Sequence, residues 1–420
     1  MKNNITNQMT DYMKKYTNLW AFSGSIAAVK NGEIIFEQSY GYANVEHKVP
    51  NTSKTKFRLY SISKQFTAVA ILMLEERGLL TVEDSVRKYF PDWTELDERI
   101  TIHQLLTHTS GLINYSDDKA WNKTRGQNVV AKRDERINIF LSKPLDFEPG
   151  TSWNYCNTGY FILEVLIERL SEMSYPKFME ENIFGLLSMK DSGVYNDLHL
   201  IENKASGYYL NNYEIIPCEY VNMNIISASG GLYSTVLDLL KWDRALKSDE
   251  LLTRKSIDKM NTDYQNNYGL GVEVNTVDGK QVISHDGGYS GFLTKIDRHL
   301  DDDFTIVALS NYGFTNVWRL CSDFAKIALE KAYKMPSKPD EFALSPELLE
   351  SYLGIYGDDD DSLAITQTTD GLNFVIDGKF NFPIYPIGEN TFQQKWIDEQ
   401  YAFDRDEEGN LSIWGCKKKK

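Results

Sequence analysis

Three short segments, far apart in the chain, carry the side chains that a serine-based acyl-transfer reaction needs. Ser61 and Lys64 are one helical turn apart, so a hydroxyl nucleophile has an amine beside it to accept its proton. Tyr155 and Asn157 add a phenol that can move protons and an amide that can hold a substrate carbonyl or Lys64. Residues 285–288 add an imidazole and a pair of glycines. Together these segments predict an enzyme that works through an acyl intermediate.

Each pattern is weak alone, because the same spacings recur in this chain. Ser-x-x-Lys also begins at Ser53, Ser174 and Ser256. As a single residue, Ser61 is better explained as a helix N-cap, and His285 as a structural histidine. The order, spacing and flanking residues of the three segments therefore have to support the assignment.

The residues after Ser61 predict how the nucleophile is activated. Residues 66–74 are apolar almost all round, which is typical of a buried helix. Lys64 at the mouth of that helix is partly desolvated, and this lowers its pKa and allows it to act as a base. Contact with the Lys64 ammonium would in turn lower the pKa of the Tyr155 phenol.

The third segment supplies backbone groups. Gly287 and Gly288 let a substrate approach the strand edge closely. The amide N–H of Gly288, opposite that of Ser61, can form an oxyanion hole, and His285 can orient a substrate group or donate a hydrogen bond.

Strands at both ends of the first 335 residues flank a helical middle. Residues 24–30 and 33–38 read as a hairpin closed by Asn31-Gly32, after a helix over 5–16. Four further strands are expected at 268–274, 281–284, 292–297 and 304–309, followed by a helix over 315–333. Helices are also expected near 101–108, 133–142, 158–171 and 235–247. We expect an α+β fold: one antiparallel sheet with the terminal helices on one face and an all-helical insert on the other.

The C-terminal part changes character after a proline-containing linker at 336–344. Residues 345–420 contain short strands, separated by turns, near 353–356, 363–367, 372–376, 381–386, 399–404 and 410–414. This spacing predicts a small β-barrel or meander as a second domain after a first domain of residues 1–335.

Composition excludes several classes of function. The chain has 420 residues, 42% of them hydrophobic, and a net charge of −15. An acidic surface repels phosphate backbones and anionic lipid, so we expect neither nucleic acid nor a membrane as a partner. The N-terminal residues 1–16 lack an apolar core of signal-peptide length, and we expect a cytoplasmic protein. Its four cysteines lack the close pairs of a zinc or redox site and are expected to be reduced.

These motifs resemble those of the serine β-lactamase and penicillin-recognising enzyme superfamily, in the class C-like branch of D-aminopeptidases, DD-peptidases and esterases. Ser61-x-x-Lys64, Tyr155-x-Asn157 and His285-x-Gly287 match the three motifs of that branch in order. The flanking stretches 105–112, 149–150 and 229–235 are also similar to it. The resemblance covers roughly residues 15–334, and residues 345–420 are similar to small lipocalin-like β-domains.

The resemblance implies a role for each motif residue. Ser61 is the acylated nucleophile, Lys64 and Tyr155 share the base and acid roles, and Asn157 positions the substrate. His108 lies in a stretch expected to form a structural turn. The third motif begins with His285 where β-lactamases usually have lysine, so the grip on a substrate carboxylate is weaker and efficient β-lactamase activity is not expected.

The leading hypothesis is a serine hydrolase for a small ester, an amide or a D-amino-acid-containing peptide, with no metal and no organic cofactor. The substrate is a small molecule or short peptide, and the oligomeric state is left open. Two alternatives remain: a transpeptidase or peptide cyclase that passes the acyl group to an amine, and a catalytically silent ligand-binding protein with the same fold.

Overall fold

The computed structural model is described over most of the chain. The described residues are 2–117, 140–223, 226–357, 363–368, 371–376, 378, 380–406 and 408–419. Most of the helix expected over 133–142 therefore lies outside them.

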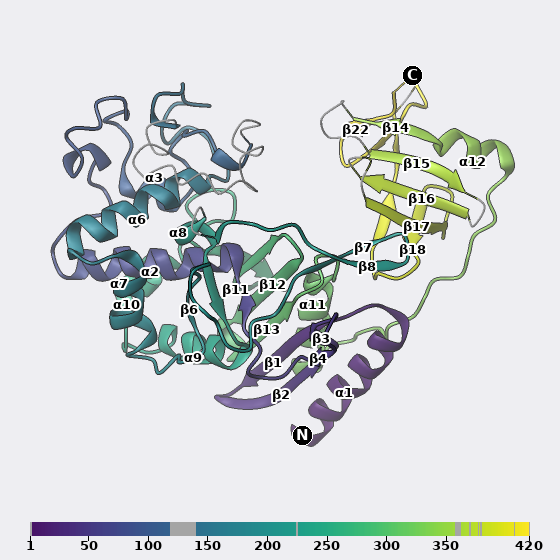
Figure 1. Ribbon diagram of the computed structural model, residues 1–420, viewed down its shortest axis with the longest axis horizontal. Helices are drawn as coiled ribbons and strands as arrows, with labels where there is room; N and C mark the ends of the chain where they lie inside the picture. Colours follow the sequence, from purple (N-terminus) through teal and green to yellow (C-terminus); the bar gives the residue numbers. More distant parts are fainter. Residues whose placement is uncertain are drawn as a thin grey trace.

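A six-stranded antiparallel sheet forms the centre of the larger part of the molecule (Figure 1). Its strand order is β10-β11-β12-β13-β1-β2, so the N-terminal hairpin joins the later strands as predicted. The bounds are β1 Gly24–Lys30, β2 Glu33–Tyr40, β10 Glu273–Val277, β11 Lys280–Tyr289, β12 Phe292–His299 and β13 Phe304–Ser310.

Helices cover both faces of this sheet. Alternate residues of β1 separate the two cores: Ile26 and Ala28 pack with α1 (Lys2–Leu19) and α11 (Val317–Ala328), whereas Ala27 faces the core that contains α2 (Ser63–Glu76). The predicted arrangement, with terminal helices on one face and the insert on the other, is confirmed, but the insert is not all-helical, because it also contains short strands. The other helices among the described residues of this part are α3 Ile102–Leu106, α6 Asn157–Ser171, α7 Tyr175–Met179, α8 Ser227–Gly230, α9 Val236–Leu246 and α10 Arg254–Met260. The short turns are η1 Tyr60–Ile62, η2 Val86–Lys88, η3 Tyr115–Asp117, η4 Glu180–Phe184 and η6 Leu300–Asp302.

Short strands complete this part of the chain. β5 (Phe57–Arg58) and β6 (Gly193–Val194) both pair with β9 (Leu232–Ser234), which brings the segment before Ser61 against residues from the end of the insert. The others are β3 Tyr42–Asn44, β4 Val49–Pro50, β7 Tyr208–Asn211 and β8 Glu214–Pro217.

One predicted strand is wrong. The region 268–274 does not run as a single strand, because β10 begins only at Glu273. Asn266, Asn267 and Gly271 have φ values of 56°, 56° and 71°, and left-handed residues interrupt an extended backbone. The hairpin turn at Asp278-Gly279, between β10 and β11, is confirmed.

The C-terminal residues form a second antiparallel sheet with its own core (Figure 1). Its six strands follow one another as a meander. The first strand also bonds to residues 417–419: the Gly357 N–H donates to the Lys417 carbonyl at 2.9 Å, and the Lys419 N–H donates to the Ile355 carbonyl at 2.7 Å. The sheet is therefore a half-barrel, in agreement with the predicted barrel-like domain. Helix α12 (Pro346–Tyr352) precedes it, and residues 331–345, which include the predicted linker, contain neither helix nor strand. The strands are β14 Gly354–Tyr356, β15 Leu363–Thr368, β16 Gly371–Ile376, β17 Phe380–Pro386, β18 Thr391–Gln394 and β19 Gln400–Ala402, followed by β20 Asp404–Arg405, β21 Leu411–Ile413 and β22 Cys416–Lys417. The domain boundaries themselves stay a prediction.

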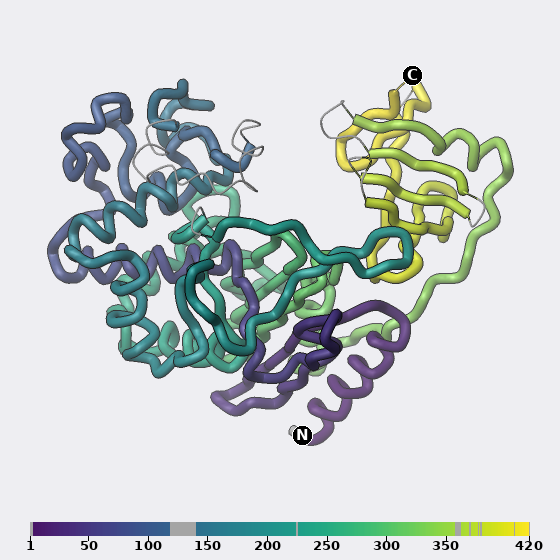
Figure 2. The backbone as a smooth tube through the Cα atoms, viewed as in Figure 1, coloured from purple at the N-terminus to yellow at the C-terminus, as the bar shows by residue number. Residues whose placement is uncertain are grey.

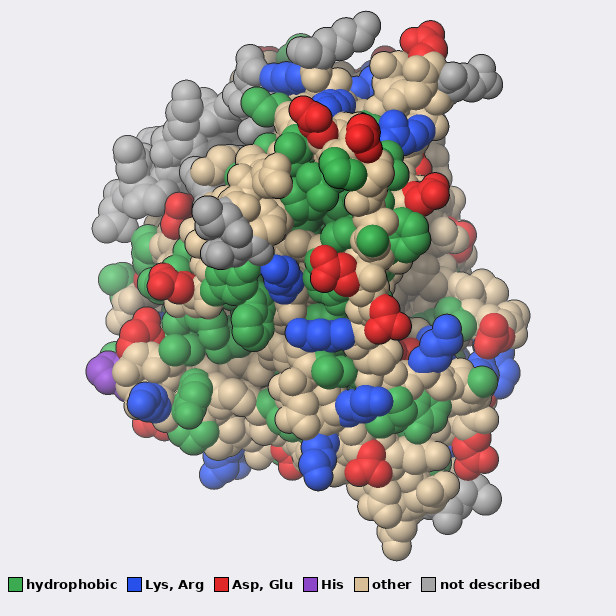
Figure 3. Space-filling view, turned by 90° about the vertical axis from the view of Figure 1, so that its right-hand side faces the viewer, with side chains coloured by type: hydrophobic (Ala, Val, Ile, Leu, Met, Phe, Trp, Pro, Cys, Tyr) green, Lys and Arg blue, Asp and Glu red, His purple; other side chains and the backbone are tan. Residues whose placement is uncertain are grey.

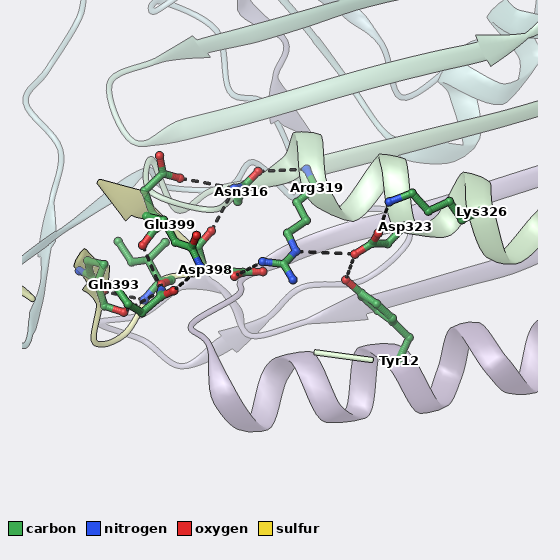
Figure 4. Close-up of polar contacts among 11 residues, drawn as sticks. Tyr12, Asn316, Arg319, Asp323, Lys326, Gln393, Asp398 and Glu399 are labelled. Carbon is green, nitrogen blue, oxygen red and sulfur yellow. Dashed lines mark hydrogen bonds and ion pairs between the residues drawn. The ribbon is translucent and has the colours of Figure 1, made fainter. Parts of the chain in front are cut away.

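Several contacts join this sheet to the rest of the molecule, among them the Ala21 N–H, which donates to the Trp396 carbonyl at 2.9 Å. The β7–β8 hairpin lies against β17, where the Asn212 N–H donates to the Asn381 carbonyl at 2.7 Å (Figure 2). On the other side, the Arg319 guanidinium of α11 pairs with the Asp398 carboxylate at 2.6 Å and also faces Asp323 (Figure 4).

Acidic and basic side chains are interspersed on the face that carries the C-terminal sheet, so the described residues form no extended surface of one charge there (Figure 3). Among the described residues, no helix has both the length and the apolar character needed to cross a membrane.

Candidate active site

Ser61 lies in the single turn η1, directly before the buried helix α2. The N-cap position of α2 belongs to Ile62, and no side chain caps the helix. The Ser61 hydroxyl is therefore not used as a helix cap, which removes the structural alternative for this residue. Its neighbour Tyr60 has a φ of 47°, and this left-handed conformation is uncommon for an aromatic residue.

The amine of Lys64 lies beside this hydroxyl. Its Nζ lies 3.2 Å from Oγ of Ser61, 2.8 Å from Oδ1 of Asn157 and 2.7 Å from the carbonyl oxygen of Ser229. The lysine is completely buried on the first turn of α2, and burial lowers its pKa to about 7. Such an amine is poised to take a proton at neutral pH.

Tyr155 stands on the other side of Lys64, with its ring centroid 4.7 Å from Nζ. We expected the ammonium to lower the pKa of this phenol, and that expectation is wrong. Burial dominates and raises the pKa well above its ordinary value, although the nearby Ser61 hydroxyl acts in the opposite direction. The Tyr155 hydroxyl is buried and has no well-oriented hydrogen-bond partner among the described residues. Tyr155 is therefore a neutral phenol with a proton to donate.

Asn157 is the first residue of α6. The backbone between Tyr155 and Asn157 is extended, because Cys156 has φ −135° and ψ 107°. The Asn157 side chain accepts from Lys64 through Oδ1 and donates to the Ser116 hydroxyl through Nδ2 at 3.3 Å. This bond fixes which end of the amide faces the lysine.

His108 supports the Tyr155 segment from behind. Its Nδ1 accepts the backbone N–H of Cys156 at 3.0 Å, and its ring centroid lies 4.3 Å from that of Tyr155. The residue is buried with a φ of 62°, and burial lowers its pKa well below the ordinary value. His108 is thus a neutral positioning residue in the turn after α3.

The third motif lies on β11, which runs directly against the Ser61 turn. A Cβ added at Gly287 would lie 2.0 Å from the Leu59 carbonyl oxygen and 3.0 Å from the Ser61 nitrogen. Only glycine allows the strand this close. Ser61 and Gly288 both border the two cavities at the site, as an oxyanion hole made of their amide groups requires.

His285 is held by partners inside the protein. Its Nδ1 lies 2.7 Å from the Asp286 carbonyl oxygen, which can only accept, so this nitrogen carries a proton. Its Nε2 lies 2.9 Å from the Tyr268 hydroxyl. Burial lowers the pKa of His285, although Glu273 and Asp286 act in the opposite direction. The neutral ring accepts from Tyr268 through Nε2, so it offers no direct positive charge to a substrate.

Two cavities meet at Ser61. One, of about 300 Å³, has only uncharged side chains among its described lining residues, including Tyr115, Asn157 and Ile226. The other, of about 650 Å³, is lined by Trp153, Trp318, the Glu273 and Asp286 carboxylates, and three asparagines.

The structure brings together all seven residues that the motifs singled out, and it adds others. The Ser229 carbonyl belongs to a stretch that we noted as a motif flank, whereas Tyr268, Glu273 and Trp318 lie in no motif. Among the described residues, Glu273, His285 and Asp286 have donor atoms within 4.8 Å of one another, a spacing that suits a metal ion. Both nitrogens of His285 are already engaged, so we assign no metal to this group.

Comparison with known proteins identifies the family. The family model described as Beta-lactamase matches residues 6–326. The chain belongs to the Beta-lactamase family. Penicillin-binding protein 4* of Bacillus subtilis (strain 168) is 28% identical over 442 residues, which span 98% of this chain and 97% of that protein.

Solved structures of similar proteins agree with this assignment. The penicillin binding protein from Bacillus halodurans is 26% identical with a TM-score of 0.67, over 75% of this chain and 98% of its own. The D-amino acid amidase from Ochrobactrum anthropi SV3, solved with L-phenylalanine amide, has a TM-score of 0.68 at 21% identity, over 78% of this chain and 97% of its own. At that identity the likeness to the amidase concerns the fold.

Proposed function

We propose that this member of the Beta-lactamase family is a serine hydrolase that forms an acyl-enzyme on Ser61. The observation that supports this most directly is the Lys64 amine, buried 3.2 Å from the Ser61 oxygen with a pKa of about 7. A family relationship alone does not require this geometry, because a silent binding protein has no use for a desolvated lysine beside an uncapped serine.

Acylation begins when Oγ of Ser61 attacks the carbonyl carbon of an ester or amide and gives its proton to Lys64. The bond between the carbonyl carbon and the leaving group breaks, and the leaving group takes the phenolic proton of Tyr155. Lys64 then returns a proton to Tyr155. In the second half, water attacks the acyl carbon, its proton returns through the same pair to Oγ, and the carboxylic acid leaves.

The backbone and Asn157 hold the reacting carbonyl. In this mechanism the N–H groups of Ser61 and Gly288 stabilise the negative charge that develops on the carbonyl oxygen. Asn157 orients Lys64 and contacts the acyl part of the substrate. His285 contributes by fixing the strand that carries Gly287 and Gly288, since both of its nitrogens bond within the protein.

The substrate class that we propose is a small ester, an amide or a D-amino-acid-containing peptide. The cavity with uncharged lining suits an apolar acyl group of modest size. The likeness to the D-amino acid amidase makes amides of D-amino acids a sensible first group to screen. A cytoplasmic location stays a prediction.

The nucleophile can be tested by covalent labelling. A fluorophosphonate probe should label one serine, and peptide mapping should place the adduct on Ser61. The Ser61→Ala variant should lose both labelling and turnover. The Ser63→Ala variant should keep both, because the Ser63 hydroxyl accepts the Leu232 N–H within the protein. Labelling of Ser63 or Ser256, or normal turnover by Ser61→Ala, would show that Ser61 is not the nucleophile.

Transfer of the acyl group to an amine is the second candidate. The cavity of about 650 Å³ beside Ser61 gives an amine room to reach the acyl-enzyme. Product analysis with and without added amines separates the two reactions. An amide product that increases with amine concentration at the expense of the free acid would identify a transferase.

A further inference from the structure

The larger of the two cavities at Ser61 has acidic walls. Glu273 and Asp286 line it, together with Asn266, Asn267 and Asn275, and no lysine or arginine is among its described lining residues. The smaller cavity, on the other side of Ser61, has no charged side chain among its described lining residues. A substrate that spans the nucleophile therefore meets two very different environments.

The two carboxylates are close enough to share one ligand atom. Their oxygen atoms lie within 4.8 Å of each other. A charge-assisted hydrogen bond is about 2.7–2.9 Å long, so a single nitrogen between the carboxylates can contact both. The Trp318 indole donates to one oxygen of Asp286 at 2.8 Å, and the Ser284 hydroxyl to one oxygen of Glu273 at 2.8 Å. These bonds orient the carboxylates and leave each with further acceptor capacity.

Nearby basic residues leave the cavity wall at Glu273 and Asp286 negatively charged. Lys295, opposite Asp286 on β12, is buried, and its charge contributes to lowering the pKa of Glu273. It is already paired with Asp297 at 3.0 Å, however, and it does not line the cavity. His285 is neutral for the reasons given above. Lys64 faces Ser61, and because burial lowers its pKa to about 7, it carries little charge above that pH.

Aromatic walls complete the cavity. Trp153 and Trp318 line the same space as the carboxylates, and indole rings attract organic cations through their faces. A carboxylate placed here would instead meet two like charges, with no cation on the described walls to pair with it.

We propose that the acidic cavity binds a cationic group, such as a primary or quaternary ammonium, on the leaving group of the substrate, while the uncharged cavity takes the acyl side chain. The inference rests on the proposed function, because it uses Ser61 as the point at which the substrate is cleaved. It adds a charge requirement that the three motifs do not contain, and it disfavours leaving groups with a carboxylate. An amine acceptor in the reverse reaction would occupy the same cavity.

Three matched thioesters test this preference during turnover. Phenylacetyl thioesters of thiocholine, of its uncharged isostere 3,3-dimethylbutanethiol and of 3-mercaptopropionate differ mainly in the charge of the leaving group. Released thiol is followed by colour, with EDTA present so that no divalent ion screens the carboxylates. We expect kcat/KM to fall from the cation to the neutral compound to the anion, with at least a tenfold ratio between the first and the last.

Paired variants test the residues. In Glu273→Gln/Asp286→Asn the cation-to-anion ratio should fall close to one. The control Asp258→Asn/Asp278→Asn removes the same number of carboxylates from exposed positions outside the cavity and should keep the wild-type ratio. A wild-type preference for the anion, or a ratio that the cavity variant leaves unchanged, overturns the proposal.

A binding measurement keeps the test independent of turnover. Benzylammonium, benzyl alcohol and benzoate are titrated into Ser61→Ala, with tryptophan fluorescence as the readout. We expect the ammonium compound to bind most tightly, and we expect this preference to disappear in Ser61→Ala/Glu273→Gln/Asp286→Asn. That result supports the cavity assignment even if no thioester is cleaved. Zn²⁺ is titrated in the same way. The proposal is overturned if all three organic compounds bind equally, or if Zn²⁺ binds and benzylammonium does not. Absence of thioester turnover in the wild type counts against the proposed function alone.

Discussion

The amine of Lys64 lies 3.2 Å from the hydroxyl of Ser61, in a position from which solvent is excluded. Asn157 and the Ser229 carbonyl fix the direction of the lysine, and the buried Tyr155 ring lies against its amine, 4.7 Å from Nζ to the ring centroid. The groups that we propose as nucleophile, base and acid thus lie close together before any substrate arrives. From this arrangement we predict how kcat/KM depends on pH and how the loss of the Tyr155 hydroxyl affects turnover.

Activity should depend on pH through Lys64. Its pKa is lowered to about 7 in the folded protein, and only the neutral amine can accept the Ser61 proton. We therefore expect kcat/KM to fall below pH 7 and to reach a plateau about one unit above it. Lys64→Arg cannot deprotonate, and it should lose about 10²–10⁴-fold in kcat/KM across this range. A flat profile between pH 5.5 and 8.5, with chemistry rate-limiting, would contradict the assignment of Lys64 as the base.

The role of Tyr155 should depend on the leaving group. Since burial raises the pKa of this phenol, we propose it as a proton donor, and an amide needs that donation more than an activated ester. Tyr155→Phe should therefore lose about 10²–10⁴-fold in kcat on an amide and clearly less on the matched p-nitrophenyl ester. Equal losses on both substrates would assign Tyr155 a purely structural role. Binding of an unreactive amide to the Ser61→Ala background, with and without Tyr155→Phe, controls for changes in affinity.

The motifs predicted the convergence of the site because each combines functional side chains with backbone constraints that are visible locally. The apolar run after Lys64 indicates a buried helix, and Gly287-Gly288 indicates a close backbone approach. Neither signal depends on distant residues. The alternating run at 24–38 likewise predicts a hairpin from local spacing alone.

Other features depend on tertiary contacts that no local pattern reveals. Tyr268 reaches His285 because the loop before β10 turns through left-handed residues, whereas the apolar run at 268–274 indicated a strand. The raised pKa of Tyr155 comes from burial that Trp153, His108 and Tyr268 create together. Strand β18 at Thr391–Gln394 was not predicted from the sequence. Both glutamine side chains are buried: Gln393 donates to backbone carbonyls and Gln394 accepts backbone N–H groups.

Gly287 should tolerate no side chain. Its Cβ would lie 2.0 Å from the Leu59 carbonyl oxygen, and relieving that clash moves β11 away from Ser61. Gly287→Ala should destabilise the protein by roughly 1–3 kcal/mol and lower kcat more than the change in stability explains. Gly388→Ala, where the nearest atom is 4.0 Å away, is the matched control and should behave like the wild type. Denaturant unfolding and kcat measured on the same preparations decide the question, and full activity in Gly287→Ala would exclude the close approach.

The ion pair between Arg319 and Asp398 should matter more at neutral pH than in acid. Asp398 is buried, burial raises its pKa to about 6, and Arg319 acts in the opposite direction (Figure 4). Removing the guanidinium leaves a buried carboxylate unpaired above pH 6. Because Arg319 is partly exposed, we expect Arg319→Met to cost roughly 1–3 kcal/mol at pH 7.5. Below pH 6 the carboxyl is protonated in the folded state, so the cost should shrink by pH 5.

The sign of this effect follows from linkage. A folded-state pKa above the unfolded value of 3.8 means that the folded protein binds the proton more tightly, so this group reduces stability as pH rises from 3.8 to 6. Loss of Arg319 raises that pKa further and extends the loss of stability to higher pH. The free energy of unfolding is measured with urea at pH 5 and at pH 7.5 for the wild type, Arg319→Met and Arg254→Met. Arg254→Met is the control, because Arg254 belongs to an exposed ion pair. A penalty for Arg319→Met that is equal at both pH values, or larger at pH 5, would show that the Asp398 carboxylate is not what Arg319 stabilises.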